Sequence, residues 1–318
     1  MTSSPKSVLL LGATGTIGRA TAKALLAAGH TVVAPVRPGA DTSTLPSAVP
    51  CTLTGPALSA VMAEHACDAV ISCISSRSGV PADAFAIDRD LNSTALRAAC
   101  GAGVTQYVLL SAICVQKPKL AFQHAKLAFE AELQAAPITW TIVHPTAYFK
   151  SLSGQLNRLR AGKPFLLFGN GELTACKPIS NDDLARYLVK CLSDPDLQNR
   201  VLQIGGPGPA ITPRAQGEML FHALGQTPRF KHVPVAMMSA IVAGLSFFGK
   251  ISPRLRDKAE LARIGRYYAT ESMLVWDHAT GRYDADATPE FGTETLADHY
   301  QRLATEDIAD DRGEHAVF

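Results

Sequence analysis

The stretch SVLLLGATGTIGRATAKALLAAGHTVVAPVRP, residues 7–38, holds the pattern that decides the fold. Its apolar run at 8–11 predicts a strand buried on both faces, and the segment 17–26 predicts a helix. A second apolar run, 31–36, predicts the next strand. A strand, a glycine turn, a helix and a strand in direct succession predict the first half of a dinucleotide-binding fold.

Three glycines, Gly12, Gly15 and Gly18, form a G-x-x-G-x-x-G turn between the first strand and the helix. Glycines allow a tight turn and a close approach of the backbone to a pyrophosphate, which the helix N-terminus then binds. The residues predicted to contact the cofactor here are Gly12, Thr14, Gly15, Thr16, Ile17 and Gly18.

Arg37 follows the second strand directly. A carboxylate at this point would favour NAD by holding the ribose 2′-hydroxyl, whereas a guanidinium suits the 2′-phosphate of NADP. The sequence therefore predicts NADPH as the cofactor.

Strands and helices continue to alternate after the first strand pair. This alternation implies right-handed crossovers and a parallel sheet. We predict an α/β fold, a doubly wound Rossmann-type parallel sheet with a smaller C-terminal substrate-binding subdomain. The further strands are expected near 49–55 and at 68–75, 106–112 and 138–146, with a helix at 90–103.

The regular alternation fades after residue 150, which sets the predicted domain boundaries. Residues 1–150 are predicted to form the dinucleotide-binding domain, and 151–304 mostly the substrate-binding part. A helix and a strand within 179–206 are expected to return to the Rossmann sheet. The polar, acidic tail at 305–318 is predicted to be mobile.

Composition excludes several classes of function. The 318-residue chain carries a formal charge of only +2, so nucleic acid is not an expected partner. Its seven cysteines are dispersed, without a C-x-x-C pair. This argues for reduced thiols in a cytosol and against a structural zinc or an iron–sulfur site, and we expect no metal site.

The most apolar segment, VPVAMMSAIVAGLSFFG at 233–249, contains no charged residue. It is short for a membrane span, opens close to a proline and includes two serines. We predict a buried or substrate-lining helix, with a peripheral membrane contact as the alternative.

Five phrases downstream of the glycine turn carry a specific resemblance. In their order they resemble the NADPH-dependent divinyl (proto)chlorophyllide 8-vinyl reductases, which are atypical, NmrA-like short-chain dehydrogenases. The resemblance runs from the glycine turn to about Leu296, nearly the whole chain. The phrases are SAICVQKPKLAFQHAKLAFEAEL (111–133), PTAYFKSLSGQ (145–155), FGNGELTACKPIS (168–180), IGGPGPAITPRAQGEMLF (204–221) and RIGRYYATESML (263–274).

This resemblance implies reduction of the 8-vinyl group of divinyl chlorophyllide a, or divinyl protochlorophyllide a, to ethyl in chlorophyll or bacteriochlorophyll biosynthesis. The implied substrate is a magnesium tetrapyrrole, and the implied location is a bacterial cytoplasm, or the periphery of the photosynthetic membrane. Two alternatives are a non-catalytic NADP-binding redox sensor of the NmrA type and an isoflavone-reductase-like enzyme for a small conjugated substrate.

The pentapeptide FQHAK at 122–126 departs from the usual short-chain dehydrogenase pattern. Such enzymes place a tyrosine four residues before the lysine, and this chain has Phe122. The tyrosine protonates a developing alkoxide, and reduction of a vinyl group forms no alkoxide. The missing hydroxyl therefore argues against carbonyl chemistry but not against catalysis. Lys126 is retained and is expected to hold the nicotinamide ribose.

The remaining site residues come from the strand ends and the matched phrases. The proton donor stays open among Lys126, His124, Tyr148 and water. His144 stands where the family usually has arginine. Further cofactor contacts are expected at Ser75, Ser111, Pro145 and Thr146, and the substrate slot is expected to include Phe122, Phe149, Phe168, Tyr267 and Tyr268, with Lys150 and Lys177 as rim cations.

Overall fold

Seven strands form one sheet in the order β3-β2-β1-β4-β5-β6-β8 in the computed structural model, which describes residues 4–43, 45 and 47–305. Neighbouring strands from β3 to β6 pair in parallel, which confirms the predicted α/β fold. The strands are β1 (Ser7–Leu11), β2 (Thr31–Val36), β3 (Ala48–Pro50), β4 (Ala69–Ser72), β5 (Gln106–Leu110), β6 (Thr139–Pro145) and β8 (Arg200–Ile204).

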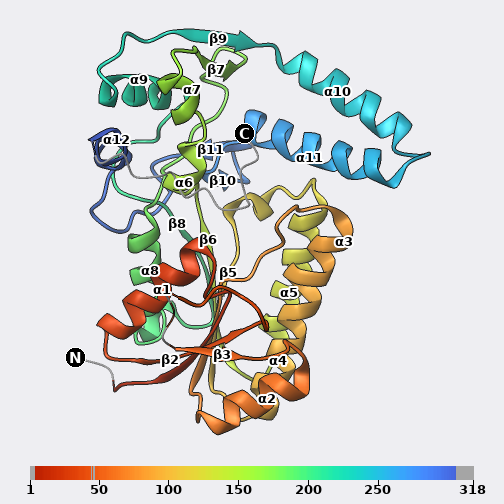
Figure 1. The fold of residues 1–318 in the computed structure, drawn as a ribbon, viewed down its shortest axis with the longest axis vertical. Helices are drawn as coiled ribbons and strands as arrows, with labels where there is room; N and C mark the ends of the chain where they lie inside the picture. The colour runs from red at the N-terminus through yellow and green to blue at the C-terminus, as the bar shows by residue number, and fades with distance from the viewer. Residues whose placement is uncertain (1–3, 44, 46, 306–318) are drawn as a thin grey trace. The chain divides into compact units, whose positions relative to one another are not determined.

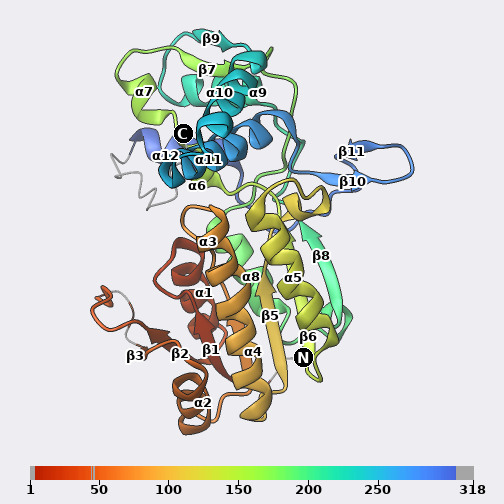
Figure 2. The ribbon, with the colours of Figure 1, turned by 90° about the vertical axis from the view of Figure 1, so that its right-hand side faces the viewer.

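Helices cover both faces of this sheet, so it is doubly wound (Figure 1). Helix α1 (Thr16–Ala27) packs on α8 (Asn181–Lys190) on one face. On the other face α4 (Asn92–Gly101) packs on both α2 (Gly55–Glu64) and α5 (Ala121–Ala135), as the turned view in Figure 2 also shows. The strands are apolar on both sides because both sides are covered.

The order of strands reverses between β1 and β4. Strands β2 and β3 are added on one side of β1, and β4, β5 and β6 are then added in turn on its other side. Ligands of open parallel sheets bind at such a switch point, outside the carboxyl ends of the strands. Short helical segments follow β4 and β5 there: α3 (Pro81–Ala84) and the π-helix η1 (Phe85–Leu91) after β4, and the 3₁₀ helix η2 (Ile113–Gln116) after β5. Another 3₁₀ helix, η3 (Pro195–Leu197), precedes β8.

The chain divides into two compact units. The first comprises the residues up to 76 together with 82–145 and 181–203, and the second comprises 77–81, 146–180 and the residues from 204 onward. The predicted domain boundaries stay a proposal, and the tail predicted at 305–318 lies, except for Thr305, outside the described residues.

The second unit has a small core of its own. Strand β7 (Phe165–Phe168) pairs in parallel with β9 (Phe230–Val233), and Phe165 packs edge to face on Phe230. Its other elements are α6 (Phe149–Leu152), α7 (Leu156–Arg160), α9 (Pro213–Ala223), α10 (Val235–Phe248), α11 (Pro253–Thr270), α12 (Leu296–Thr305) and the hairpin of β10 (Val275–Asp277) and β11 (Arg282–Asp284).

Helix α10 forms where the apolar segment predicts it, but the predicted burial is wrong. Within the helix only Val242 is buried, and several large apolar side chains face solvent. Among the described elements, the main packing partner of α10 is α11, which covers one strip of its surface. None of the described helices is long and apolar enough to cross a membrane.

Candidate active site

The glycine turn is built for close backbone contact. Gly12 has φ +77°, and a Cβ atom there would lie 2.8 Å from the carbonyl carbon of Cys73. A Cβ atom on Gly18 would lie 2.0 Å from the carbonyl oxygen of Gly12. Neither position accepts a side chain without moving backbone, so the glycines hold α1 directly against the turn after β1.

The N-terminus of α1 suits an anion. Gly15 is the N-cap residue and has no side chain to occupy the first-turn N–H groups. The positive end of the helix dipole, without a capping side chain, suits a pyrophosphate. The turn thus fits a dinucleotide, because its glycines keep the backbone tightly closed and leave the N-terminus of α1 without a covering side chain.

Arg37 follows β2 directly and is exposed. It lies at the carboxyl end of β2, as the glycine turn lies at the carboxyl end of the parallel neighbour β1. Its guanidinium has no ion-pair partner in the part of the chain that the structure describes. The charge is therefore available to a phosphate group.

Lys126 makes a buried ion pair that the sequence analysis did not anticipate. Its Nζ atom donates to Oδ1 of Asp88 over 2.8 Å, and the side chains are 9% and 0% exposed. Lys126 lies on α5, whereas Asp88 lies in the π-helix η1, which packs on α5. A buried ammonium needs such a carboxylate to offset its loss of hydration.

Asp88 also ties this pair to the end of β4. The hydroxyl of Ser75 donates to Oδ1 of Asp88 over 2.8 Å, and the backbone N–H of Ser76 lies 3.3 Å from the same carboxylate. The ammonium, the carboxylate and Ser75 thus form one network beside the glycine turn, where Cys73 donates its backbone N–H to Leu11.

A second buried network surrounds Glu130, four residues after Lys126 and hence on the same side of α5. The hydroxyl of Ser111, directly after β5, donates to Oε1 of Glu130. Nε2 of His144 lies 3.0 Å from the same oxygen, with both side chains almost fully buried. Ser111 and His144 therefore both have a partner within the protein, and the side chain of His144 is buried.

Burial suppresses the acid–base reactivity of the Cys73 thiol, beside the glycine turn, and of the Tyr107 phenol on β5. Burial raises the pKa of Cys73 to about 12, although the hydroxyl of Thr21 opposes the shift. Burial likewise raises the pKa of Tyr107, whose hydroxyl donates to Asn92 over 3.2 Å. Both groups therefore stay protonated at neutral pH and serve structure rather than acid–base chemistry.

The FQHAK segment forms the start of α5. Phe122 is buried, and its ring lacks the hydroxyl that a tyrosine would carry there. His124 is exposed, whereas Lys126 is buried, because residues two apart on a helix face different directions. His124 is therefore not among the proton donors that we propose.

Several residues predicted to meet ligands serve the structure of the second unit instead. Lys177 is buried and donates to Glu290 over 2.6 Å, so the prediction of a rim cation is corrected. This hydrogen bond lowers the pKa of Glu290. Phe149 is buried in the hydrophobic core of the second unit. The hydroxyl of Thr146 donates to the carbonyl of Lys177.

The other predicted substrate residues differ in exposure. Tyr267 is buried on α11, whereas its neighbour Tyr268 is exposed. Tyr148, the N-cap residue of α6, is half-buried. Lys150 and Phe168 are also half-buried, and Pro145 ends β6. Tyr148 belongs to the second unit, and Lys126 and His124 belong to the first.

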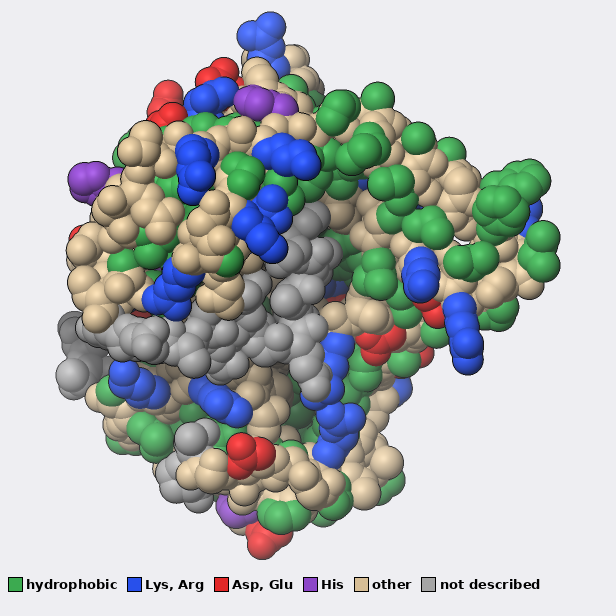
Figure 3. Space-filling view, turned by 45° about the horizontal axis from the view of Figure 1, so that its top comes forward, with side chains coloured by type: hydrophobic (Ala, Val, Ile, Leu, Met, Phe, Trp, Pro, Cys, Tyr) green, Lys and Arg blue, Asp and Glu red, His purple; other side chains and the backbone are tan. Residues whose placement is uncertain are grey.

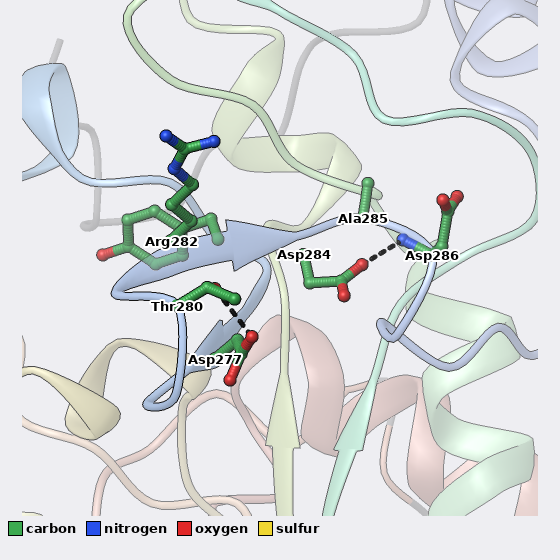
Figure 4. Close-up of a pocket in the computed structure, with 7 residues that line it drawn as sticks. Asp277, Thr280, Arg282, Asp284, Ala285 and Asp286 are labelled. Carbon is green, nitrogen blue, oxygen red and sulfur yellow. Dashed lines mark hydrogen bonds between the residues drawn. The ribbon is translucent and has the colours of Figure 1, made fainter.

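A hollow at the β10–β11 hairpin carries several acidic side chains (Figure 4). Asp277 accepts from the hydroxyl of Thr280 over 2.6 Å, and Asp284 accepts from the backbone of Asp286 over 2.8 Å. These carboxylates stabilise their own turns. Over residues 4–43, 45 and 47–305, no group of three His, Cys, Asp or Glu side chains could hold a metal ion.

Comparison with known proteins identifies the family. A model of the NAD(P)H-binding family matches residues 12–195. The divinyl chlorophyllide a 8-vinyl-reductase of Oryza sativa subsp. indica is 44% identical over 99% of this chain and 83% of its own length. The enzyme of the same name from Zea mays is 45% identical over 99% of this chain and 84% of its own. The chain belongs to the divinyl chlorophyllide a 8-vinyl reductase family.

This membership confirms an oxidoreductase with a nicotinamide cofactor. Solved structures show the same fold. One, of pinoresinol-lariciresinol and phenylcoumaran benzylic ether reductases, superposes with a TM-score of 0.69 at 17% identity, over 94% of this chain and 99% of the other. The redox-sensor and isoflavone-reductase-like alternatives are not favoured, because the relatives above 40% identity are all 8-vinyl reductases.

The predicted bacterial cytoplasmic location is wrong. The 8-vinyl reductases at 41–49% identity, from rice, maize, cucumber and Arabidopsis thaliana, are named as chloroplastic proteins. Dispersed reduced cysteines do not distinguish a cytosol from a chloroplast, which explains the error.

Sequence reasoning missed Asp88 and Glu130. Asp88 lies in the acidic run DRD at 88–90, whose charges look solvated in the sequence, and only the structure shows that one of them is buried. A signal for Glu130 existed. It lies one helical turn after Lys126, so a buried lysine would predict a further polar residue on that face.

Proposed function

We propose that this protein uses NADPH to reduce the 8-vinyl group of divinyl chlorophyllide a to an ethyl group. The observation that carries the proposal is the 44–45% identity, over 99% of the chain, to reductases of that name. In the reaction the vinyl group gains one hydride and one proton. NADPH, when bound at the glycine turn, would supply the hydride and would itself be oxidised to NADP⁺.

The chain's own residues bind and orient the cofactor. We assign the pyrophosphate to the turn from Gly12 to Gly18 and to the N-terminus of α1, where missing side chains permit close approach. The 2′-phosphate of the adenosine ribose is assigned to Arg37, which is exposed after β2. A charge-assisted contact of this kind distinguishes NADPH from NADH.

Lys126 is assigned to the hydroxyl groups of the nicotinamide ribose. One of its three protons is donated to Asp88, which fixes the direction of the ammonium group. The other two protons can be donated to a sugar. Because Asp88 also accepts from Ser75, the lysine is held against the end of β4. This preorganisation lowers the cost of orienting the cofactor.

The absence of a tyrosine at position 122 agrees with the chemistry proposed. Hydride transfer to the vinyl carbon places negative charge on carbon, where the conjugated macrocycle spreads it. Protonation then takes place at carbon, so the reaction does not need a tyrosine hydroxyl that protonates an alkoxide. Of the side chains proposed as proton donors, Lys126 and Tyr148 remain, since His124 is exposed.

The direct test is an anaerobic incubation of the purified protein with divinyl chlorophyllide a and NADPH. We expect a monovinyl product by chromatography and a blue shift of the Soret band, because one conjugated double bond is lost. A folded protein that binds NADPH but leaves the pigment unchanged would refute the proposal. The Lys126→Ala variant, run in parallel, should bind NADPH less tightly and turn over more slowly.

A further inference from the structure

The α10–α11 pair carries a concentration of exposed apolar side chains. Phe247 and Phe248 are 65% and 55% exposed at the end of α10, and Ile251 is 82% exposed in the turn that follows. Met237 and Ile241, further back on α10, are each about half exposed. Figure 3 shows hydrophobic side chains gathered over this pair, with lysine and arginine beside them. Apolar patches on a soluble surface mark interaction sites.

The spacing places these residues on one side of the helix. Met237, Ile241 and Phe248 are separated by four and seven residues, which is one face of an α-helix. Phe247 and Phe248 pack edge to face with ring centroids 5.3 Å apart. The exposed apolar face therefore runs along α10 and ends in an aromatic pair and an isoleucine at the turn.

Close contacts hold α10 and α11 together at the turn between them. A Cβ atom on Gly249 would lie 3.0 Å from the Cα atom of Arg256, so the turn needs glycine for the two helices to approach each other. Nη2 of Arg263 on α11 donates to the hydroxyl of Ser246 on α10 over 2.8 Å. The apolar side chains are therefore presented by a helical hairpin whose two helices are in close contact at the turn.

Positive charge surrounds the apolar turn. Residues 245–258 contain two lysines and two arginines against Asp257, so four positive charges less one negative leave +3 in a chain whose total is +2. Lys250, Arg254, Arg256 and Lys258 are exposed, and none of them pairs with a carboxylate in the part of the chain that the structure describes. The cations are therefore available to a negatively charged partner.

We propose that the α10–α11 hairpin inserts its turn into the surface of an anionic lipid membrane. Phe247, Phe248 and Ile251 would enter the boundary between headgroups and acyl chains, while the neighbouring cations contact lipid phosphates. Long basic side chains suit this boundary because their stems are apolar and their ends are charged. A second copy of the chain fits the face less well, since a symmetric contact would bring the +3 clusters together.

The test is co-sedimentation of the full chain with vesicles of phosphatidylcholine mixed with phosphatidylglycerol, and with vesicles of phosphatidylcholine alone. We expect binding to the anionic vesicles that weakens as salt is added, because screening reduces the attraction of the cations. Replacing Phe247, Phe248 and Ile251 together by serine should weaken binding by about tenfold or more. Arg254→Glu with Arg256→Glu should weaken it by roughly fivefold or more per charge removed.

The controls are Leu173→Ser, a half-exposed leucine of the second unit, and Arg97→Glu, an exposed arginine on α4. Both should bind vesicles as the parent does, and circular dichroism should confirm that each variant is folded. The proposal is overturned if the parent chain does not bind anionic vesicles, or if the triple serine variant binds equally well. It is also overturned if sedimentation shows a dimer that the serine substitutions dissociate while vesicle binding is absent. NADPH-dependent activity is not used as a readout, so the result is independent of the proposed function.

Discussion

The ammonium nitrogen of Lys126 lies 2.8 Å from Oδ1 of Asp88, and the two side chains are only 9% and 0% exposed. The pair connects α5 to the π-helix η1, a type of element that is frequent at functional sites. A lysine held in this way cannot rotate freely, so its remaining protons have a fixed direction. We regard Asp88 as a positioning residue for the cofactor site.

Replacement of Asp88 by asparagine should uncouple this pair. The buried ammonium then lacks a counter-charge, and we expect the free energy of unfolding to fall by about 3 kcal/mol. The KM for NADPH should rise, because the lysine is no longer directed. Chemical denaturation and steady-state kinetics measure the two effects. Asp90→Asn, which changes an exposed carboxylate of the same segment, is the control and should leave both unchanged. Equal stability and kinetics in the two variants would show that the pair has no role.

Replacement of Arg37 by alanine should reduce the preference for NADPH over NADH. A hydrogen bond to a charged group contributes about 1.5–3 kcal/mol, so the KM for NADPH should rise roughly tenfold to a hundredfold. The KM for NADH, which has no 2′-phosphate, should change little. Arg97→Ala on α4 serves as the matched control. A parallel loss of affinity for both cofactors would place the 2′-phosphate elsewhere.

A tyrosine at position 122 should not improve the enzyme. Phe122→Tyr puts a hydroxyl four residues before Lys126, at a site that is 8% exposed. Since no alkoxide forms during vinyl reduction, we expect kcat for the pigment to stay level or fall. Single-turnover rates with parent and variant measure this directly. A rise of tenfold or more would mean that an oxygen-centred charge develops after all.

The network around Glu130 should matter for stability. Glu130→Ala leaves the hydroxyl of Ser111 and the imidazole of His144 buried without their partner, which costs about 1–3 kcal/mol for each group. Thermal and chemical unfolding should therefore show a large loss, whereas Gln134→Ala, exposed on the same helix, should show none. His144→Leu should reproduce part of the loss. Unchanged melting of Glu130→Ala would contradict the assignment of Ser111 and His144 to a structural network.

Stability should fall as the solution becomes mildly acidic, in part through His299. Burial lowers the pKa of His299 from 6.5, and the ring lies beside Phe149 with centroids 5.3 Å apart. The unfolded chain takes up the proton first as the pH falls through about 6.5, so this histidine favours unfolding only below that pH. His30, whose pKa is also lowered by burial, acts in the same direction. His299→Gln should show a shallower decline between pH 7 and pH 5, and identical slopes in parent and variant would contradict the assignment.

The sequence predicted the structure correctly wherever a local pattern of residues determines the backbone conformation. The glycine turn at Gly12 and Gly18 depends on close contacts that only glycine allows, so its position could be predicted from spacing. The parallel sheet follows from apolar runs separated by helices. The apolar residues of α10 predicted a helix equally well, but hydropathy does not say what covers a helix, and here α11 covers only part of it.

Long-range polar partners were beyond the reach of the sequence. Asp88 and Lys126 are 38 residues apart, and Lys177 and Glu290 are 113 apart, so no periodicity connects them. For the same reason Lys177 was predicted to be a rim cation and is in fact buried. The sequence also could not show that Phe149 packs in a core, because an aromatic residue in a matched phrase can belong to a core as readily as to a binding slot.

The measurement that tests the central claim most directly uses NADPH deuterated at the transferable position of the nicotinamide ring. The parent chain is incubated with divinyl chlorophyllide a, and the pigment is analysed by mass spectrometry. The proposed function predicts a monovinyl product that carries one deuterium in its new ethyl group. An unlabelled ethyl group would show that the hydride does not come from this cofactor, and recovery of unreacted pigment would contradict the proposed activity itself.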